Sequence, residues 1–164
     1  MRNYLTYGAG LAFLGLAVFA THASADGQPR TVIKLHQARP ELHTIDVAPK
    51  GHSDGDILTF EADLTGENGR HAVLDGYLIT VDEANASEPD EDRFSHMVVD
   101  FGDGSTIVAE GRSSYSAAAT EMANNKPRLR AVVGGTGEFI GARGQISTWR
   151  NEDGSYDHTI ELLP

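Results

Sequence analysis

Cysteine is absent from all 164 residues of the chain. This absence excludes a disulfide framework, a thiolate nucleophile and any cysteine-ligated metal site. Positive charge is also scarce, because 13 Lys and Arg side chains stand against 24 Asp and Glu side chains, giving a formal net charge of -11. An acidic chain without basic clusters repels phosphate backbones, so we expect no nucleic-acid partner. The length suits one domain with a substantial core.

Signatures of hydrolases and metalloenzymes are missing as well. The sequence has no Gly-x-Ser-x-Gly elbow, which leaves a hydrolase triad without an anchor. No two of its seven histidines have the helical spacing of a zincin site. We therefore expect no metal site, although a pair of histidines on different strands, such as His96 and His158, remains an alternative.

Long apolar runs are confined to the N-terminus. Arg2 precedes an apolar stretch at residues 8–20, and Ala23-Ser24-Ala25 precedes Asp26. This pattern predicts a secretory signal peptide at residues 1–25, a mature chain that is secreted or periplasmic, and no stable membrane insertion after cleavage. The alternative, an uncleaved membrane anchor, falls short of the roughly 20 residues that span a bilayer.

Short alternating runs fill the rest of the chain. Residues 57–64 place Leu58, Phe60, Ala62 and Leu64 on one face of a strand. Similar runs cover residues 42–47, 72–81, 94–101, 105–110, 128–133, 145–150 and 156–162, whereas residues 31–36 are either a first strand or an ordered arm. We expect the acid-rich residues 82–93 to form a solvated loop and residues 113–126 to form a long loop or an irregular helical turn. Strands at this spacing indicate an antiparallel barrel or sandwich of about eight strands.

A glycine-dense corner lies at residues 132–145, where VVGGTG resembles the turn that opens a dinucleotide-binding domain. That fingerprint requires a third glycine at position 140, where this chain has Ile140, and a helix after it. The residues that follow alternate like a strand instead. A dinucleotide site is therefore not expected.

The same corner, GGTGEFIGARGQ at residues 134–145, resembles the Gly-Gly-x-Gly-x-Phe-x-Gly-Ala-x-Gly signature of the allene oxide cyclase and dirigent barrel superfamily. Two further pieces occur in the family's order, GDILTF at residues 55–60 and FGDGSTIVAEG at residues 101–111. The resemblance covers about residues 44–162. It implies an all-β, eight-stranded antiparallel closed barrel, often trimeric, which uses no metal or organic cofactor. We divide the chain into the signal peptide, an N-terminal arm or first strand at residues 26–43, and the barrel at residues 44–164.

The resemblance also implies polar anchors for a substrate. The acid of the Gly-Asp piece is Asp56, and the arginine of the glycine corner is Arg143. Each has a structural alternative, Asp56 as a turn residue that caps its own backbone and Arg143 as a corner residue paired with surface carboxylates. In plant allene oxide cyclases the key acid lies on the first strand shortly before a proline, and Glu41 or Asp46 occupies the comparable place here. The catalytic candidates are Asp56, Arg143 and Asp46.

Side chains on the strands are candidates for the wall of a ligand cavity. Alternation places His158 on one face of the last strand and Trp149 on one face of its neighbour, and the sequence leaves open which face looks inward. The predicted ligand-binding residues are Phe60, Tyr77, His96, Trp149 and His158.

Function follows from the resemblance as an expectation. We expect an exported barrel that binds an apolar small molecule and directs its cyclisation or isomerisation, assembled as a dimer or trimer. A non-catalytic dirigent-like or lipocalin-like binding protein is the alternative, and a barrel whose interior is filled by side chains is a third.

Overall fold

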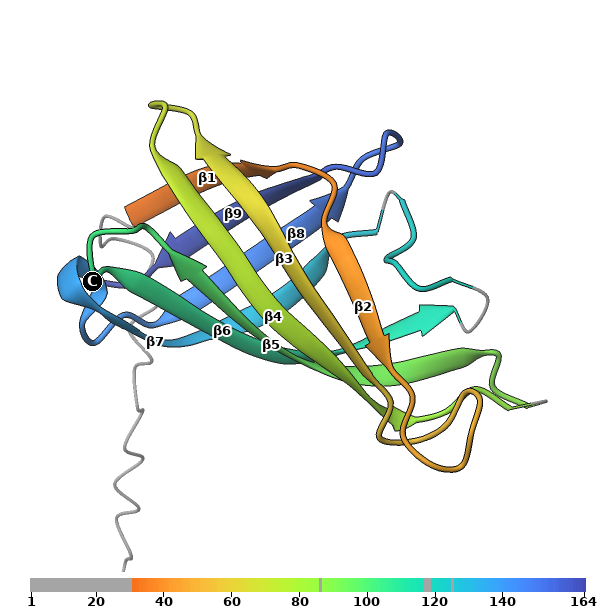
Figure 1. Ribbon diagram of the computed structural model, residues 1–164. Coiled ribbons are helices and arrows are strands. Elements are labelled where there is room, and N and C mark those ends of the chain that lie inside the picture. The colour runs from red at the N-terminus through yellow and green to blue at the C-terminus, as the bar shows by residue number, and fades with distance from the viewer. Residues whose placement is uncertain (1–30, 86, 117–118, 125) are drawn as a thin grey trace, which may run out of the picture.

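The computed structural model describes residues 31–85, 87–116, 119–124 and 126–164. These residues confirm the expected all-β class (Figure 1). The strands are β1 (Thr31–Gln37), β2 (Glu41–Ile45), β3 (Ile57–Gly66), β4 (His71–Asp82), β5 (Asp90–Asp100), β6 (Thr106–Ser116), β7 (Arg128–Thr136), β8 (Gly144–Arg150) and β9 (Tyr156–Leu162). A short 3-10 turn, Gly137–Phe139, is the single helical piece in the described part of the chain. The predicted signal peptide at residues 1–25 lies outside the described residues.

The sheet closes into a barrel. Its strand order is β1-β9-β8-β7-β6-β5-β4-β3, every pairing is antiparallel, and β1 returns to the far end of β3, where Leu35 lies opposite Gly66. The ninth strand, β2, is an extra one that pairs with the other half of β3, so that Leu42 lies opposite Phe60. The predicted eight-stranded closed barrel is therefore confirmed. The segment predicted to be an arm or a first strand is β1, one of the eight barrel strands.

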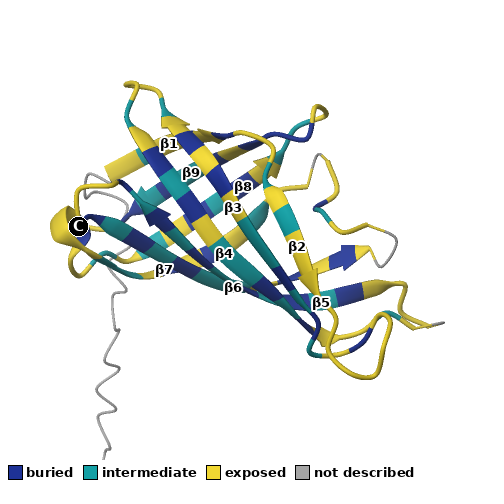
Figure 2. Ribbon diagram, viewed as in Figure 1, coloured by how far each residue is buried: buried dark blue, intermediate teal, exposed yellow. Residues whose placement is uncertain are grey.

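Buried residues alternate with more exposed ones along the strands (Figure 2), as expected when successive side chains face the barrel interior and the outer face in turn. Along β5 the inward residues change from polar to apolar, beginning with Glu91 and Arg93 and ending with Val99. The last strand does the same, since Tyr156 and His158 precede two buried aliphatic side chains. Because β5 and β9 run in the same direction, the interior has an apolar end, called the packed end below, and a polar end, called the cavity end.

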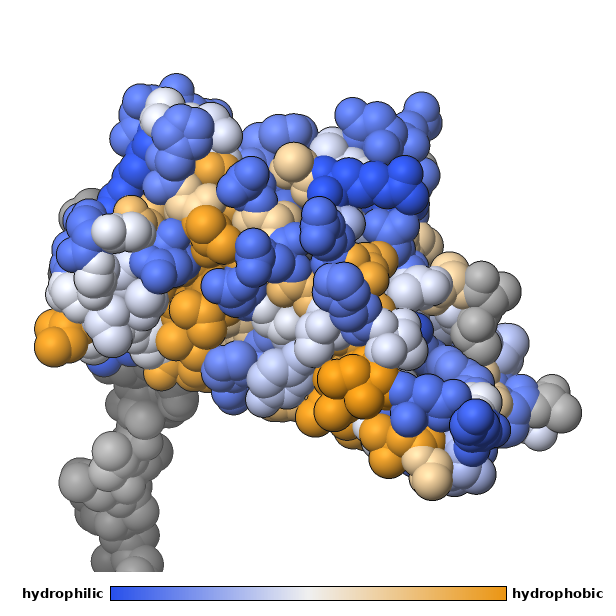
Figure 3. All heavy atoms as spheres, in the orientation of Figure 1, coloured by the Kyte–Doolittle hydropathy of each residue, from blue (hydrophilic) through white to orange (hydrophobic). Residues whose placement is uncertain are grey.

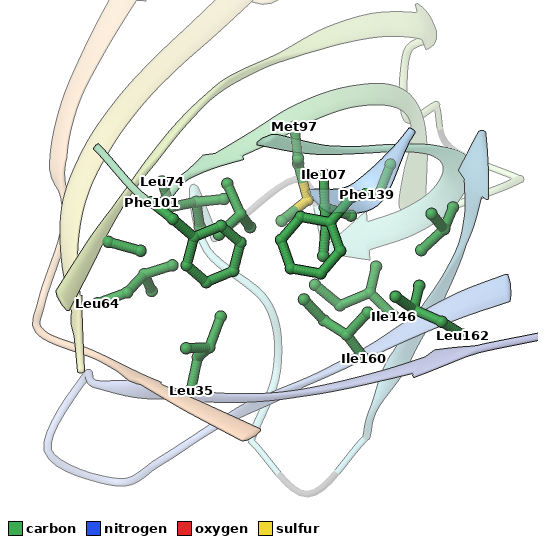
Figure 4. Packing of buried hydrophobic residues seen from close by; sticks show 14 residues of the cluster. Leu35, Leu64, Leu74, Met97, Phe101, Ile107, Phe139, Ile146, Ile160 and Leu162 are labelled. Carbon is green, nitrogen blue, oxygen red and sulfur yellow. The ribbon is translucent and has the colours of Figure 1, made fainter. Parts of the chain in front are cut away.

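The packed end holds most of the hydrophobic core (Figure 4). Its largest labelled members are Leu35, Leu64, Leu74, Met97, Phe101, Ile107, Phe139, Ile146, Ile160 and Leu162. The glycine corner belongs to this end, because its 3-10 turn places the Phe139 ring 5.1 Å from the ring of Phe101. Burial of this many aliphatic and aromatic side chains supplies the main stabilisation, at about 25 cal/mol per Å² of apolar surface removed from water.

Two loop predictions are corrected by the strand bounds. β5 begins at Asp90, inside the segment predicted to be a solvated loop, and Glu91 and Arg93 are buried within the barrel. β6 continues to Ser116, six residues past the predicted end of that strand at residue 110. In both places charged or small polar residues lie in strands, because those that face inward form hydrogen bonds or ion pairs with buried partners. Amino-acid composition alone does not reveal such partners.

The outer face carries an apolar row at one corner. The register aligns Ile45, Ile57, Ile79 and Phe94 on four neighbouring strands, and apolar side chains gather over β2, β3 and β4 in Figure 3. Ile45 is exposed and the other three are partly buried. The predicted dimer or trimer stays a prediction. In the described residues, no helix has the length and apolar character needed to cross a membrane.

Candidate functional site

A cavity of about 60 Å³ lies at the cavity end of the barrel. Most of its wall is apolar, contributed by Leu42, Leu58, Phe60, Leu74, Leu78, Met97 and Met122. Several polar side chains converge on it, namely Gln37, Tyr115, Glu121, Arg130, Thr148, Tyr156 and His158. An apolar wall with a few convergent polar groups is the usual composition of a small-molecule site.

A second recess of about 210 Å³ adjoins the first and shares Leu58, Leu78 and Thr120 with it. Its wall is more polar. Arg93 and His52 line it, and behind them the fully buried Glu91 is ion-paired with Arg93 and contacts His52. The guanidinium of Arg93 also lies over the ring of Tyr115, at 4.7 Å from its centroid. The buried carboxylate is thus neutralised locally, as a charge inside a barrel must be.

Residues 119–124, called the covering segment, lie between β6 and β7 in the chain (Figure 1), and Thr120, Glu121 and Met122 form part of the cavity wall. Met122 is buried and packs in one apolar cluster with Leu58 and Leu78. Glu121 accepts hydrogen bonds from the Tyr156 hydroxyl at 2.9 Å and from Arg150 Nη2 at 2.9 Å. Part of the predicted long loop therefore forms a cover, which is anchored by side chains of β8 and β9.

His158 is buried in the wall, where both ring nitrogens have partners. Nε2 lies 2.7 Å from the amide oxygen of Gln37, and Nδ1 lies 3.0 Å from the hydroxyl of Thr148. An amide oxygen only accepts, so Nε2 carries the proton and donates, while Nδ1 accepts from the hydroxyl. Burial, and next the nearby charge of Arg130, lower the pKa of His158 to about 3. The imidazole is therefore neutral at physiological pH.

Arg130 is the second buried polar group of interest. Its Nε donates to Ser95 Oγ at 2.6 Å and its Nη2 donates to the Tyr115 hydroxyl at 3.0 Å. Ser95 in turn donates to the carbonyl of Gly111 at 2.9 Å, which turns a lone pair of Ser95 toward the guanidinium. Nη1 is buried and has no acceptor among the described residues.

Two of the predicted ligand-binding residues line the cavity. Phe60 reaches it from β3 and His158 reaches it from β9. The predicted catalytic acid Asp56 lines the second recess instead, where its Oδ1 accepts the Val47 N–H at 2.9 Å and its Oδ2 accepts the Ser53 N–H at 3.0 Å. These hydrogen bonds lower the pKa of Asp56. The geometry is that of the capping alternative, and a catalytic role stays a prediction.

The other three predicted wall residues lie on the outer face. Tyr77 and His96 stack on each other there, with ring centroids 5.3 Å apart, and His96 also contacts Glu110 at 2.8 Å. Trp149 points outward from β8 and is 39% exposed. His96 and His158 consequently lie on opposite faces of the barrel wall, which excludes the metal site that such a pair would form.

The remaining catalytic candidates lie away from the cavity. Arg143 is exposed at the packed end and donates to the Pro164 carbonyl at 3.0 Å. Asp46 is exposed after β2 and accepts the Gly51 N–H at 3.2 Å. Neither residue lines the cavity or the second recess.

Sequence reasoning missed Arg130, Tyr115, Gln37, Thr148 and Glu91. Arg130 was missed because β7 inverts the usual alternation, in which apolar side chains face inward and charged ones outward. Leu129 is 58% exposed and Val133 is 54% exposed on the outer face, whereas Arg130 is buried. One signal was available. Arg130 shares a strand face with Val132, and a charge on the same face as a core valine indicates a buried cation.

Comparison with solved structures places the barrel among known folds. Pyocyanin demethylase matches with a TM-score of 0.64 and 15% identity over 81% of this chain and 100% of that chain. The Diels–Alderase AbmU from Streptomyces koyangensis matches with a TM-score of 0.61 and 17% identity, over 82% of this chain and 63% of that chain. A pterocarpan synthase dirigent protein matches with a TM-score of 0.50 and 19% identity over 82% and 84% of the two chains.

Comparison of the sequence, by contrast, finds no matching family model and no matching curated protein. Identities of 15% to 19% establish a common fold and nothing finer. The protein has the closed β-barrel fold that a demethylase, a Diels–Alderase and a dirigent protein share.

Proposed function

We propose that the protein binds a small, largely apolar molecule at the cavity end of the barrel and directs its cyclisation or isomerisation. One observation carries this proposal. The interior is filled with side chains at the packed end but hollow at the other end, where apolar walls surround a few convergent polar groups. Solved structures of the same fold include a Diels–Alderase and a dirigent protein, which supports a reaction of this class.

The residues present suit catalysis by confinement. Walls built from Leu58, Phe60 and Met97 would hold an apolar chain in a folded conformation and exclude water from its reacting ends. Tyr156 keeps its proton, since burial and the neighbouring carboxylate of Glu121 raise its pKa. Its hydroxyl and that of Thr148 are the neutral hydrogen-bonding groups that would orient the ligand.

Entry of a ligand requires the covering segment to move. The cavity of about 60 Å³ is smaller than the roughly 300–1,000 Å³ of typical ligand sites. Met122 lines the cavity through apolar packing, so we propose that its withdrawal widens the cavity toward the second recess, which shares Leu58, Leu78 and Thr120 with it.

A second candidate function is non-catalytic binding of the same class of molecule. It is favoured by the environment of His158, whose two ring nitrogens are both engaged by Gln37 and Thr148, which leaves this imidazole no free lone pair to act as a base. Such a protein would carry the ligand or direct the coupling of radicals formed elsewhere.

Export is part of the proposal. We propose that residues 1–25 are removed as a signal peptide and that the mature chain begins at Asp26 in the secreted or periplasmic fraction. Intact-mass measurement of the protein from its own host tests this directly. A chain that retains Met1 would contradict export by cleavage.

The experiment for the main proposal is native mass spectrometry of the protein purified from its host, followed by turnover of the released ligand without any oxidase. A small apolar adduct that the protein converts into a cyclic or isomeric product supports the enzyme. An adduct that binds but is not converted supports the binding protein. Absence of an adduct, together with failure to bind an apolar dye, would overturn both and favour a filled barrel.

A further inference from the structure

One buried charge of the cavity end has no ion-pair partner among the described residues. Glu91 is paired with Arg93, and Glu121 is paired with Arg150. Arg130 is only 5% exposed, yet within the described ranges no carboxylate lies within ion-pair distance of it. A buried guanidinium with only neutral partners is costly, because desolvation of its charge is left uncompensated.

The neighbouring groups do not compensate for this charge. Its two hydrogen-bond partners, Ser95 and Tyr115, are neutral hydroxyls. His158 also lies in the wall, and it contributes no negative charge in either protonation state. Nη1 can donate two hydrogen bonds and finds no acceptor in the part of the chain that the structure describes.

The barrel holds the guanidinium in a fixed place. Gly111 lies beside Arg130 on the adjacent strand, and a Cβ at position 111 would come within 3.1 Å of Arg130 Cγ. The glycine thus provides the space in which the side chain lies, and the chain of hydrogen bonds through Ser95 sets its orientation. Such pre-organisation of a charged fork is typical of sites that recognise an oxyanion.

We propose that the ligand of the cavity is an organic anion, in which an apolar body carries a carboxylate or enolate oxygen that binds Arg130. This proposal rests on the proposed function and specifies its substrate class. The oxyanion accepts from Nη1 and gives the Arg130 guanidinium the anionic partner it lacks, while the apolar body lies against Leu58, Phe60 and Met97. Because Nη1 is buried, the ligand reaches it when Met122 is withdrawn and the cavity widens.

Two fluorescent probes with the same apolar body test the inference. Anilinonaphthalene sulfonate carries an oxyanion, and N-phenylnaphthylamine lacks it. We expect the wild-type protein to bind the sulfonate at least about tenfold more tightly than the neutral probe. A charge-assisted hydrogen bond in an apolar site contributes a binding free energy that corresponds to this difference in affinity. Arg130→Met should abolish the preference and leave binding of the neutral probe unchanged.

A matched control removes a surface charge instead. Arg112 projects from the outer face with 68% of its side chain exposed, and Arg112→Met changes the net charge equally. This variant should keep the preference for the sulfonate. Loss of the preference in Arg112→Met as well would show that long-range charge, and not Arg130, selects the anion, and would overturn the proposal.

The remaining outcomes are also decisive. Equal affinity of the wild-type protein for the two probes would overturn the oxyanion site while leaving the apolar cavity intact. Binding of neither probe would overturn the proposed function together with this inference. If Arg130→Met fails to fold, heteronuclear NMR of the wild-type arginine side chains decides, because the sulfonate must shift the Arg130 guanidinium signals and the neutral probe must not.

Discussion

The Nε2 proton of His158 is donated to the amide oxygen of Gln37, which joins the last strand of the barrel to the first across 2.7 Å. This contact is buried and lies where the chain leaves β1 for β2. The neutral imidazole is thus part of the seam that closes the barrel. Its protonation state links pH to stability.

Stability should therefore fall when the pH drops from about 7 to about 5. Burial lowers the pKa of His158 to about 3 in the folded protein, whereas the unfolded chain has the usual value near 6.5. The unfolded state binds the proton first, so the free energy of unfolding decreases as the pH falls through 6.5 toward the folded pKa, by about 2 kcal/mol at pH 5. Urea unfolding at both pH values measures this loss. His158→Gln should lose less stability over the same interval, and equal losses would contradict the assignment.

The covering segment should open faster when its carboxylate is removed. Glu121→Ala deletes the acceptor of Tyr156 and of Arg150, which costs about 1–3 kcal/mol of stability. Stopped-flow fluorescence with N-phenylnaphthylamine should show faster association in this variant. Glu152→Ala, which changes an exposed acid, is the control. An unchanged association rate in Glu121→Ala would mean that the covering segment does not limit entry.

Asp56 should prove to be a stabilising residue whose effect depends on pH. Its lowered pKa means that the ionised carboxylate stabilises the fold above the unfolded value of about 4, and that this contribution is lost as the pH falls through the folded pKa. Asp56→Asn places an amide NH₂ against one of the two backbone N–H donors, which then has no acceptor. The Tm of this variant should therefore be lower than that of the wild type at neutral pH and approach it in acid. Asp63→Asn, on the exposed side of β3, should change Tm little at either pH. A Tm of Asp56→Asn equal to wild type at neutral pH would remove the capping role.

Gly137→Val should prevent folding. Gly137 has a φ of 57°, and a Cβ there would lie 2.5 Å from Ser105 Oγ and 2.9 Å from the Gly104 carbonyl oxygen. Strain and overlap together should cost at least about 3 kcal/mol. Circular dichroism and soluble yield measure the effect. Gly134→Ala is the control, because its Cβ meets nothing within 4 Å, and a folded, stable Gly137→Val would contradict this description of the corner.

The barrel could be predicted from the sequence because its signals are local. Alternation at residues 57–64 and the glycine corner at residues 134–145 each identify a piece of backbone without knowledge of its partners. Phe60 and His158 were placed on strand faces by the same period. That period does not reveal which face is inward, and Trp149 and His96 accordingly project outside.

The polar half of the interior could not be predicted in this way. Glu91 and Arg93 have the composition of solvated charges, although they form an ion pair with each other on one face of β5. Their further partners, His52 and the Thr120 carbonyl, are distant in the chain and become adjacent only in the folded barrel. Arg130 depends on Ser95, which is 35 positions away in the chain. The positions of interior charges depend on such contacts between distant residues. Strand propensity and turns, by contrast, are encoded within a few consecutive residues.

Barrel closure also determines when the chain can fold. Thr31 pairs with Leu162, so the first described strand has no complete partner until the last strand has been synthesised. Contacts between residues this distant in sequence form slowly, because the entropy of a long loop is lost before the contacts stabilise it. A nascent chain that ends before Tyr156 therefore keeps β1 and β8 as open edges, and the barrel remains an unfinished sheet until β9 has been synthesised.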